Sequence, residues 1–101
     1  MAKEFNESNF DSSIKSGIAV VDFWAPWCGP CKMMTPVIEK VANDNPDLTV
    51  GKVNVDDCPT IAQKYNILSI PTIIIFKNGE PVGQTIGVVS EKALMDKIKA
   101  V

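Results

Sequence analysis

The sequence predicts an α/β fold in which helices cover both faces of a mixed β-sheet. In the first part of the chain, apolar and β-branched segments alternate with helical patterns, as strands joined by crossover helices do. An Asn-Gly turn signal then links two further strand patterns, and a helical pattern closes the sequence. With 101 residues, 46% of them hydrophobic, the chain is long enough for one domain with its own core, over residues 1–101.

The predicted elements alternate until the closing hairpin and helix. In order they are a weak strand over residues 2–5, a short helix that begins after Asn6 or Ser8 and ends at Gly17, a strand over 18–25, a helix after the cysteines, a strand over 48–55, a short helix over 60–65, a strand within 69–77, a returning strand over 81–88 and a last helix capped by Ser90.

Each strand has its own sequence pattern. The segment IAVVDFWA is almost continuously apolar, which is typical of a central strand covered on both faces, and only Asp22 interrupts it. LTVGKVNV alternates, and SIPTIIIFK resembles a second buried strand. Asn78-Gly79 predicts the hairpin turn. Pro81 and Gly83 then favour an edge position for the returning strand.

The helices are predicted from apolar residues spaced three and four apart. Their inward-facing residues are Phe10 and Ile14 in the first, Met34, Val37, Ile38 and Val41 in the second, and Leu94, Ile98 and Val101 in the last. Pro36 should kink the second helix, because it removes a backbone donor and crowds the preceding turn.

Composition excludes several classes of function. Ten lysines and no arginine stand against twelve acidic residues, and the formal net charge of −2 argues against nucleic acid or an anionic membrane as the main partner. The absence of histidine excludes an imidazole base and histidine-ligated metal sites. The first ten residues contain no apolar core of signal-peptide length, and three cysteines fit a reducing compartment, so we expect a cytoplasmic protein.

Two of the three cysteines, Cys28 and Cys31, bracket a Gly-Pro dipeptide where a central strand should give way to a helix. As a structural staple they would close a loop of about four residues, which yields only about 2 kcal/mol. As a zinc site they would lack ligands, because the chain offers three thiols and no histidine. A redox pair fits best, because a Cys28 thiolate would face the positive end of the helix dipole.

These residues resemble a known family. VVDFWAPWCGPCK is similar to the active-site segment of thioredoxins, and GKVNVD, KYNILSIPT, FKNGE and the IG before the last helix recur in family order and spacing. The resemblance implies a thioredoxin fold, with a sheet of five strands, or four and a short edge strand, and four helices on both faces. It also implies a thiol–disulfide oxidoreductase that reduces the disulfides of client proteins.

The resemblance implies separate roles for the residues of the pair. Cys28 would be the nucleophile, exposed at the helix start, and Cys31 the resolving thiol, shielded behind it. Gly29 and Pro30 match the reducing members, whereas oxidising relatives tend to carry a histidine between the cysteines. The opposite direction of electron flow, in a disulfide donor or isomerase, is the first alternative.

Two charged residues would assist the pair. From the sequence alone, Asp22 could equally be a strand-end carboxylate that points to solvent, and Lys52 an ordinary exposed lysine. The resemblance implies instead that Asp22 is buried behind the cysteines, where burial raises the pKa of the carboxyl and lets it exchange the proton of Cys31. Lys52 would be the partner of Asp22 across the sheet.

A client-binding rim is implied around Pro71. This residue aligns with a family cis-proline, although X–Pro bonds are usually trans. A cis bond would free the backbone of Ile70 to pair with an extended client strand. Trp27, Gly87 and Val88 would complete the apolar rim, and a side chain at Gly87 would block close approach of a partner backbone.

The resemblance also implies partners and leaves some features open. Trp24 would pack under the active site, and Ser69 stands where many relatives have glycine. Electrons would come from a separate reductase, an NADPH-dependent flavoprotein or a ferredoxin-linked enzyme, and the monomeric chain should need no cofactor or metal. A second alternative is a binding subunit in which the thiols are incidental. Cys58 could be a small, half-buried residue at a loop-to-helix start, or an oxidisable thiol used for regulation or for intermolecular pairing.

Overall fold

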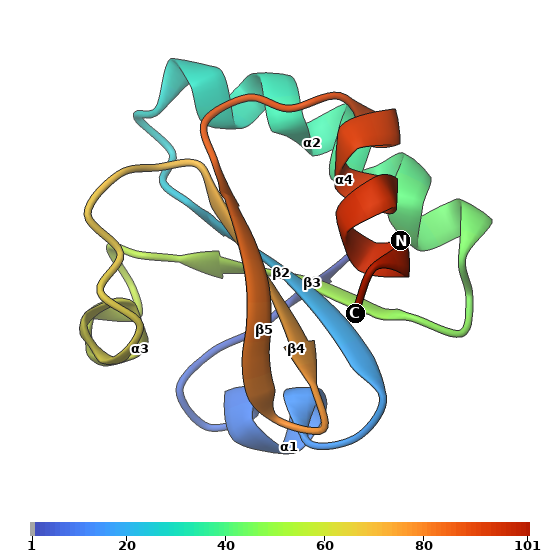
Figure 1. Ribbon diagram of the computed structural model, residues 1–101. Helices are drawn as coiled ribbons and strands as arrows, with labels where there is room; N and C mark the ends of the chain where they lie inside the picture. Colours follow the sequence, from blue (N-terminus) through green and yellow to red (C-terminus); the bar gives the residue numbers. More distant parts are fainter. Residues whose placement is uncertain (1) are drawn as a thin grey trace.

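The chain folds around a central sheet, as the computed structural model of residues 2–101 shows (Figure 1). The elements of these residues are β1 (Lys3–Glu4), α1 (Phe10–Ile14), β2 (Ile18–Trp24), α2 (Gly29–Asp44), β3 (Thr49–Asn54), α3 (Pro59–Lys64), β4 (Thr72–Lys77), β5 (Glu80–Ile86) and α4 (Glu91–Lys99).

The sheet is mixed, as predicted, and its strand order is β1-β3-β2-β4-β5. The pairs β1–β3 and β3–β2 are parallel, whereas β2–β4 and β4–β5 are antiparallel. The edge strand β1 contains only two residues. The expected α/β fold class, with five strands of which one is a short edge strand, is therefore confirmed.

Helices cover both faces of the sheet: α2 and α4 lie over one face, and α1 and α3 lie on the other side (Figure 1). Successive side chains of β2 point to opposite faces. Ala19, Val21 and Phe23 join the core that also contains α1 and α3 residues, while Val20 joins the core beneath α2 and α4. Burial on both faces explains why the β2 sequence is almost continuously apolar.

The predicted hairpin turn is present between β4 and β5. Asn78 and Gly79 both have positive φ, +52° and +86°, as a type I′ turn requires. The backbone N–H of Asn78 donates to the Gly17 carbonyl, and the Gly17 N–H donates to Asn78 Oδ1, each at 2.9 Å. These two hydrogen bonds fasten the hairpin to the loop that precedes β2.

The predicted start of the first helix is wrong by one to three residues. Asn9, not Asn6 or Ser8, precedes Phe10, and its side chain does not cap the helix. Asn6 Oδ1 instead accepts hydrogen bonds from Ser8 and Asn9, so this side chain stabilises the preceding turn. The helix also ends at Ile14, before Gly17. The Ser90 cap is confirmed, because its Oγ accepts the Ala93 N–H at 3.1 Å.

Candidate redox site

The two cysteines of the CGPC segment are joined by a disulfide at the start of α2, with Cα atoms 5.3 Å apart. Cys28 is the N-cap residue of α2, in an extended conformation, and its Sγ accepts the backbone N–H of Cys31 at 3.1 Å. Pro30 lies in the first helical turn, where its missing N–H costs no helical hydrogen bond. The local sequence therefore places the Cys28 sulfur against the free N–H groups of a 16-residue helix.

Both sulfurs are buried in this oxidised form. Cys28 is 5% exposed and Cys31 2%, so the expectation that Cys28 is exposed is wrong for the disulfide state. The reason is local packing. The two cysteines form a buried cluster with Ala25, and Trp24, Val55 and Ile70 pack against this cluster. Cys28 is still the less buried of the two cysteines.

The loop before β4 lies beside Cys28. The Ile70–Pro71 bond is cis, as the family resemblance implied. The Sγ of Cys28 lies 3.8 Å from the Ile70 carbonyl oxygen, and the Pro71 carbonyl accepts the Gly87 N–H at 2.8 Å. Within residues 2–101 the Ile70 N–H has no hydrogen-bond acceptor, so it is free to bind another chain.

Exposed apolar side chains surround this loop and the disulfide, as expected. Trp27 is 70% exposed and Val88 46%. Gly87 has a φ of +85°, and a Cβ added there would meet no atom of residues 2–101 within 4 Å. Its backbone conformation, rather than crowding within the chain, therefore requires glycine.

The orientation of Trp27 depends on a residue that the sequence did not single out. The indole Nε1 donates to Asp56 Oδ2 at 2.9 Å, although the two residues are 29 positions apart. Asp56 follows β3 just as Trp27 follows β2, and the two parallel strands are neighbours. Adjacent ends of parallel strands were the signal that could have indicated this contact.

Asp22 lies on the strand that leads to the cysteines and is 1% exposed, which excludes the solvent-facing alternative. Its Oδ1 has no hydrogen-bond partner among residues 2–101. Burial raises the pKa of Asp22 from 3.8 to about 7; the positive charge of Lys52 acts against this increase and the negative charge of Glu4 adds to it. The carboxyl can therefore hold or release a proton near neutral pH.

Lys52 is the cross-strand neighbour of Asp22, but it pairs with another acid. Its Nζ lies 3.7 Å from Glu4 Oε1 and 5.1 Å from the centroid of the Trp24 ring. Among residues 2–101 its ion pair is with Glu4, so the implied Asp22–Lys52 partnership is one of proximity, not of a direct ion pair. Glu4 is a second residue that sequence reasoning missed.

Comparison with known proteins agrees with this geometry. A model of the family described as Thioredoxin matches residues 1–100. The chain belongs to the thioredoxin family. Relatives named Thioredoxin include one from Chlamydia pneumoniae, 44% identical over 97% of this chain and 96% of its own, and one from Staphylococcus saprophyticus, 47% identical over 92% and 90%.

The fold agrees as well. A chain solved in a study of the thiol-resolving mechanism of yeast mitochondrial 1-Cys peroxiredoxin, via glutathione and thioredoxin systems, matches with a TM-score of 0.89 and 35% identity, over 99% of this chain and 95% of that chain. The Cys28–Cys31 pair occupies the active-site position of the family, so the protein is a dithiol–disulfide oxidoreductase with protein-disulfide reductase activity. Its partners are disulfide-containing client proteins and a thioredoxin reductase.

The third cysteine, Cys58, is buried and unpaired. It is 3% exposed and precedes α3, with its Sγ 4.0 Å from the Phe5 carbonyl oxygen. Burial raises the pKa of this thiol, and the charges of Glu7, Asp57 and Glu4 raise it further. Its position at a loop-to-helix start is as expected, and its side chain is more deeply buried than the half-buried one that the sequence suggested.

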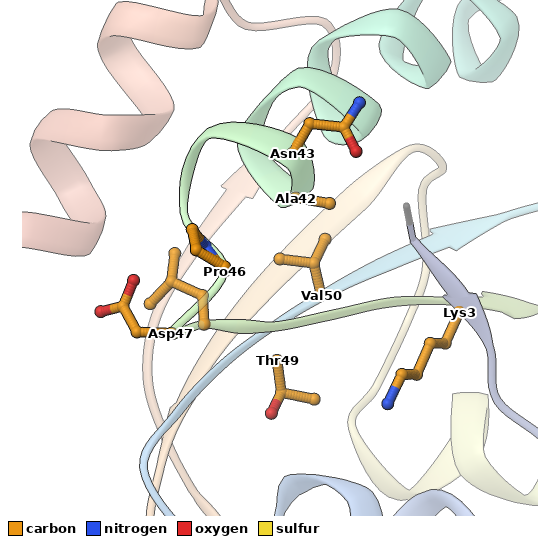
Figure 2. Close-up of a pocket in the computed structure, with 8 residues that line it drawn as sticks. Lys3, Ala42, Asn43, Pro46, Asp47, Thr49 and Val50 are labelled. Atoms are coloured by element: carbon orange, nitrogen blue, oxygen red, sulfur yellow. The ribbon is translucent and has the colours of Figure 1, made fainter.

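A surface pocket of about 420 Å³ lies at the far end of α2 from the cysteines (Figure 2). It is lined by Lys3, Ala42, Asn43, Pro46, Asp47, Leu48, Thr49 and Val50. Figure 2 shows the polar groups of Lys3, Asn43 and Asp47 pointing in different directions. Because a binding site needs converging polar groups, the disulfide and its rim remain the candidate site. The helices within residues 2–101 are too short or too polar to cross a bilayer.

Proposed function

We propose that Cys28 is the nucleophile and Cys31 the resolving thiol when this protein reduces a client disulfide. The observation that carries the proposal is the position of the Cys28 sulfur, which accepts the Cys31 N–H at the N-terminus of α2. A hydrogen bond and a helix dipole that both favour negative charge lower the cost of a thiolate. Cys31 is the more buried cysteine, which suits a thiol that attacks only from within the protein.

The proposed reaction is two consecutive thiol–disulfide exchanges. The Cys28 thiolate attacks one sulfur of the client disulfide, and the other client sulfur leaves as a thiolate. Cys31 then loses its proton and attacks the Cys28 sulfur, so the bond between Cys28 and the client breaks. The client gains two electrons and leaves as a dithiol, and the protein is left with the Cys28–Cys31 disulfide.

Asp22 is proposed to accept the proton of Cys31. A general base works best when its pKa is near the ambient pH, and the pKa of Asp22 is about 7. Lys52, its neighbour on β3, favours the ionised form of the carboxyl and so limits the increase that burial causes.

The client is proposed to bind as an extended strand along Ile70 and Pro71. The free N–H of Ile70 supplies a main-chain donor next to Cys28. Residues on either side of the disulfide would complete the surface that binds the client, namely Trp27, Gly29, Pro30, Gly87 and Val88. Main-chain pairing to an apolar rim makes few demands on client side chains, which suits a protein with many clients.

We further propose that residues 1–101 act as one monomeric domain in the cytoplasm. The reductase that returns the electrons would be an NADPH-dependent flavoprotein or a ferredoxin-linked enzyme. Within the sequence no G-x-G-x-x-G fingerprint is present, and two cysteines suffice to carry two electrons, so no bound cofactor is proposed.

Trapping the mixed disulfide tests the roles of the cysteines. Cys31→Ser, incubated with a disulfide-bonded client, should accumulate a covalent complex through Cys28, detected by mass spectrometry, and Cys28→Ser should not. A complex through position 31 would reverse the assignment.

A redox titration read by the fluorescence of Trp24 and Trp27 tests the direction of electron flow. A midpoint potential well below that of the glutathione pool supports reduction of clients, and a midpoint near those of oxidising relatives would contradict it.

A further inference from the structure

Three charged side chains form one row across the sheet. Lys52 on β3 is in register with Asp22 on one side and with Glu4 on the other. Residues in register on neighbouring strands share a face of the sheet, and neighbouring strands lie about 4.8 Å apart. Glu4, Lys52 and Asp22 therefore lie side by side on one face, in that order from the sheet edge inward.

Within this row the lysine makes its ion pair on the outer side, with Glu4, and it also contacts the ring of Trp24, which lies two residues beyond Asp22 on β2. The Lys52 Nζ is 3.7 Å from Glu4 Oε1 and lies over the Trp24 ring, 5.1 Å from the centroid. The Glu4 side chain is 58% exposed, that of Lys52 19%, and Asp22 is almost completely buried. The cation thus has two attractive partners, and the inner carboxyl keeps an Oδ1 without a hydrogen bond from residues 2–101.

We propose that Glu4 is a positioning residue for the redox reaction: it holds the Lys52 ammonium toward the sheet edge and so makes ionisation of the buried Asp22 carboxyl less favourable. The two acids compete for one cation, and the exposed acid keeps it at lower cost, because its charge remains in water. The consequence for catalysis rests on the proposed role of Asp22, whereas the competition itself does not.

No other charge faces Asp22 from the elements packed around it in residues 2–101. The residues of α2 and α4 buried over this face of the sheet are Met34, Ile38, Val41, Leu94 and Ile98, and the opposite residue on β4 is Ile73. Of the charged residues of α2, Glu39 is partly buried, and its Oε1 accepts the Ala2 N–H at 2.9 Å. Cys31 adds a thiol once the disulfide is reduced. The charges that act on the pKa of Asp22 are those of Lys52 and Glu4.

The test is the titration of Asp22 in Glu4→Gln, followed through its carboxyl ¹³C resonance, which Asp22→Asn assigns. We expect the pKa of Asp22 to fall, so that its protonated fraction at pH 7 drops about twofold or more. Glu7→Gln is the matched control, because it removes the same charge from the same segment but lies outside the row. An unchanged or higher pKa in Glu4→Gln, or an equal fall in both variants, would overturn the proposal.

A double-mutant cycle tests whether Glu4 acts on Asp22 through Lys52. In the Lys52→Gln background, Glu4→Gln should shift the titration of Asp22 clearly less than in the wild-type background. An equal shift in both backgrounds would show a direct effect of the Glu4 charge and contradict the positioning role.

Enzyme kinetics separate this proposal from the proposed function. The acidic limb of the pH–rate profile for client reduction should move to lower pH in Glu4→Gln, together with the Asp22 resonance. If the titration midpoint of the Asp22 resonance moves and the acidic limb of the pH–rate profile does not, Glu4 controls the ionisation of Asp22, but Asp22 does not accept the proton of Cys31. If neither moves while Asp22→Asn is still impaired, the role of Asp22 stands and that of Glu4 fails.

Discussion

The β2–α2 and β3–α3 junctions are built alike, yet only one of them carries the redox chemistry. The strands are parallel neighbours, so both junctions lie at the same edge of the sheet. Each junction places a buried cysteine at a helix N-cap, Cys28 before α2 and Cys58 before α3, with a proline in the first helical turn. The connecting segments, residues 25–28 and 55–58, also match in length.

The junctions differ in what surrounds the sulfur. Three residues after Cys28 stands Cys31, whose N–H donates to the first sulfur, whereas three residues after Cys58 stands Ile61, and Cys58 makes no capping hydrogen bond. The helix α2 has 16 residues and α3 has six, so the dipole at Cys58 is weaker. Burial and nearby acidic side chains raise the pKa of Cys58. These differences favour a reactive thiolate at Cys28 and disfavour one at Cys58.

The largest expected effect separates the two junctions by activity. Cys28→Ser should reduce client reduction by at least about a hundredfold, because the nucleophile is lost. Cys58→Ser should leave the rate within about twofold of wild type, because its sulfur takes no part in exchange. Steady-state reduction of a chromogenic disulfide measures both variants. A large loss in Cys58→Ser, with its fold intact by circular dichroism, would contradict the comparison.

Sequence patterns predicted what depends on neighbouring residues. The Asn78-Gly79 turn, the Ser90 cap and the apolar run of β2 are local, and each is present. The cysteine pair was placed correctly at the strand-to-helix junction, because its signal lies within four residues.

Contacts between distant residues could not be predicted in the same way. The hydrogen bond from Trp27 to Asp56 and the ion pair from Lys52 to Glu4 depend on strand order and register. The burial of Cys28 also depends on Ile70, which is 42 positions away in the sequence. The family resemblance supplied the burial of Asp22, which its own strand pattern left undecided.

Asp22 gives the β2–α2 junction a dependence on pH. The folded protein binds the Asp22 proton more tightly than the unfolded chain, because the pKa rises from 3.8 to about 7. This contribution to stability is complete below about pH 4 and is lost as pH rises through 7, a loss on the order of 4 kcal/mol. Asp22→Asn should lack this loss, so urea unfolding of the oxidised proteins should show the variant gaining relative stability between pH 4 and 8.

An apolar replacement at the same position, Asp22→Leu, controls for the polarity of the new side chain. Asp22→Leu removes the proton-linked loss as well, so its stability relative to wild type should rise over the same pH range. A stability difference from wild type that stays constant with pH in both variants would show that the folded protein does not hold the Asp22 proton as proposed.

Adding a second cysteine at the β3–α3 junction tests whether spacing alone makes a redox site. Ile61→Cys, introduced together with Cys28→Ser and Cys31→Ser, creates the same spacing at Cys58. We expect no recovery of client reduction, because α3 is short and the pKa of Cys58 is raised. The lost Ile61 packing should cost about 1 to 2 kcal/mol of unfolding free energy. A rate of client reduction within tenfold of wild type would show that the spacing of the two cysteines is sufficient for redox activity.

The smallest effect concerns the cap itself. Serine is a preferred N-cap residue, and the Cys58 sulfur makes no cap hydrogen bond, so Cys58→Ser can add one that the native junction lacks. Cys58→Ala cannot, and we expect the serine variant to be about 1 kcal/mol more stable than the alanine variant in urea unfolding. Equal stability of the two variants would contradict this prediction. It would mean that the cost of burying the hydroxyl cancels the gain from the cap, or that the backbone at Cys58, which is not extended as at Cys28, does not allow a side-chain cap.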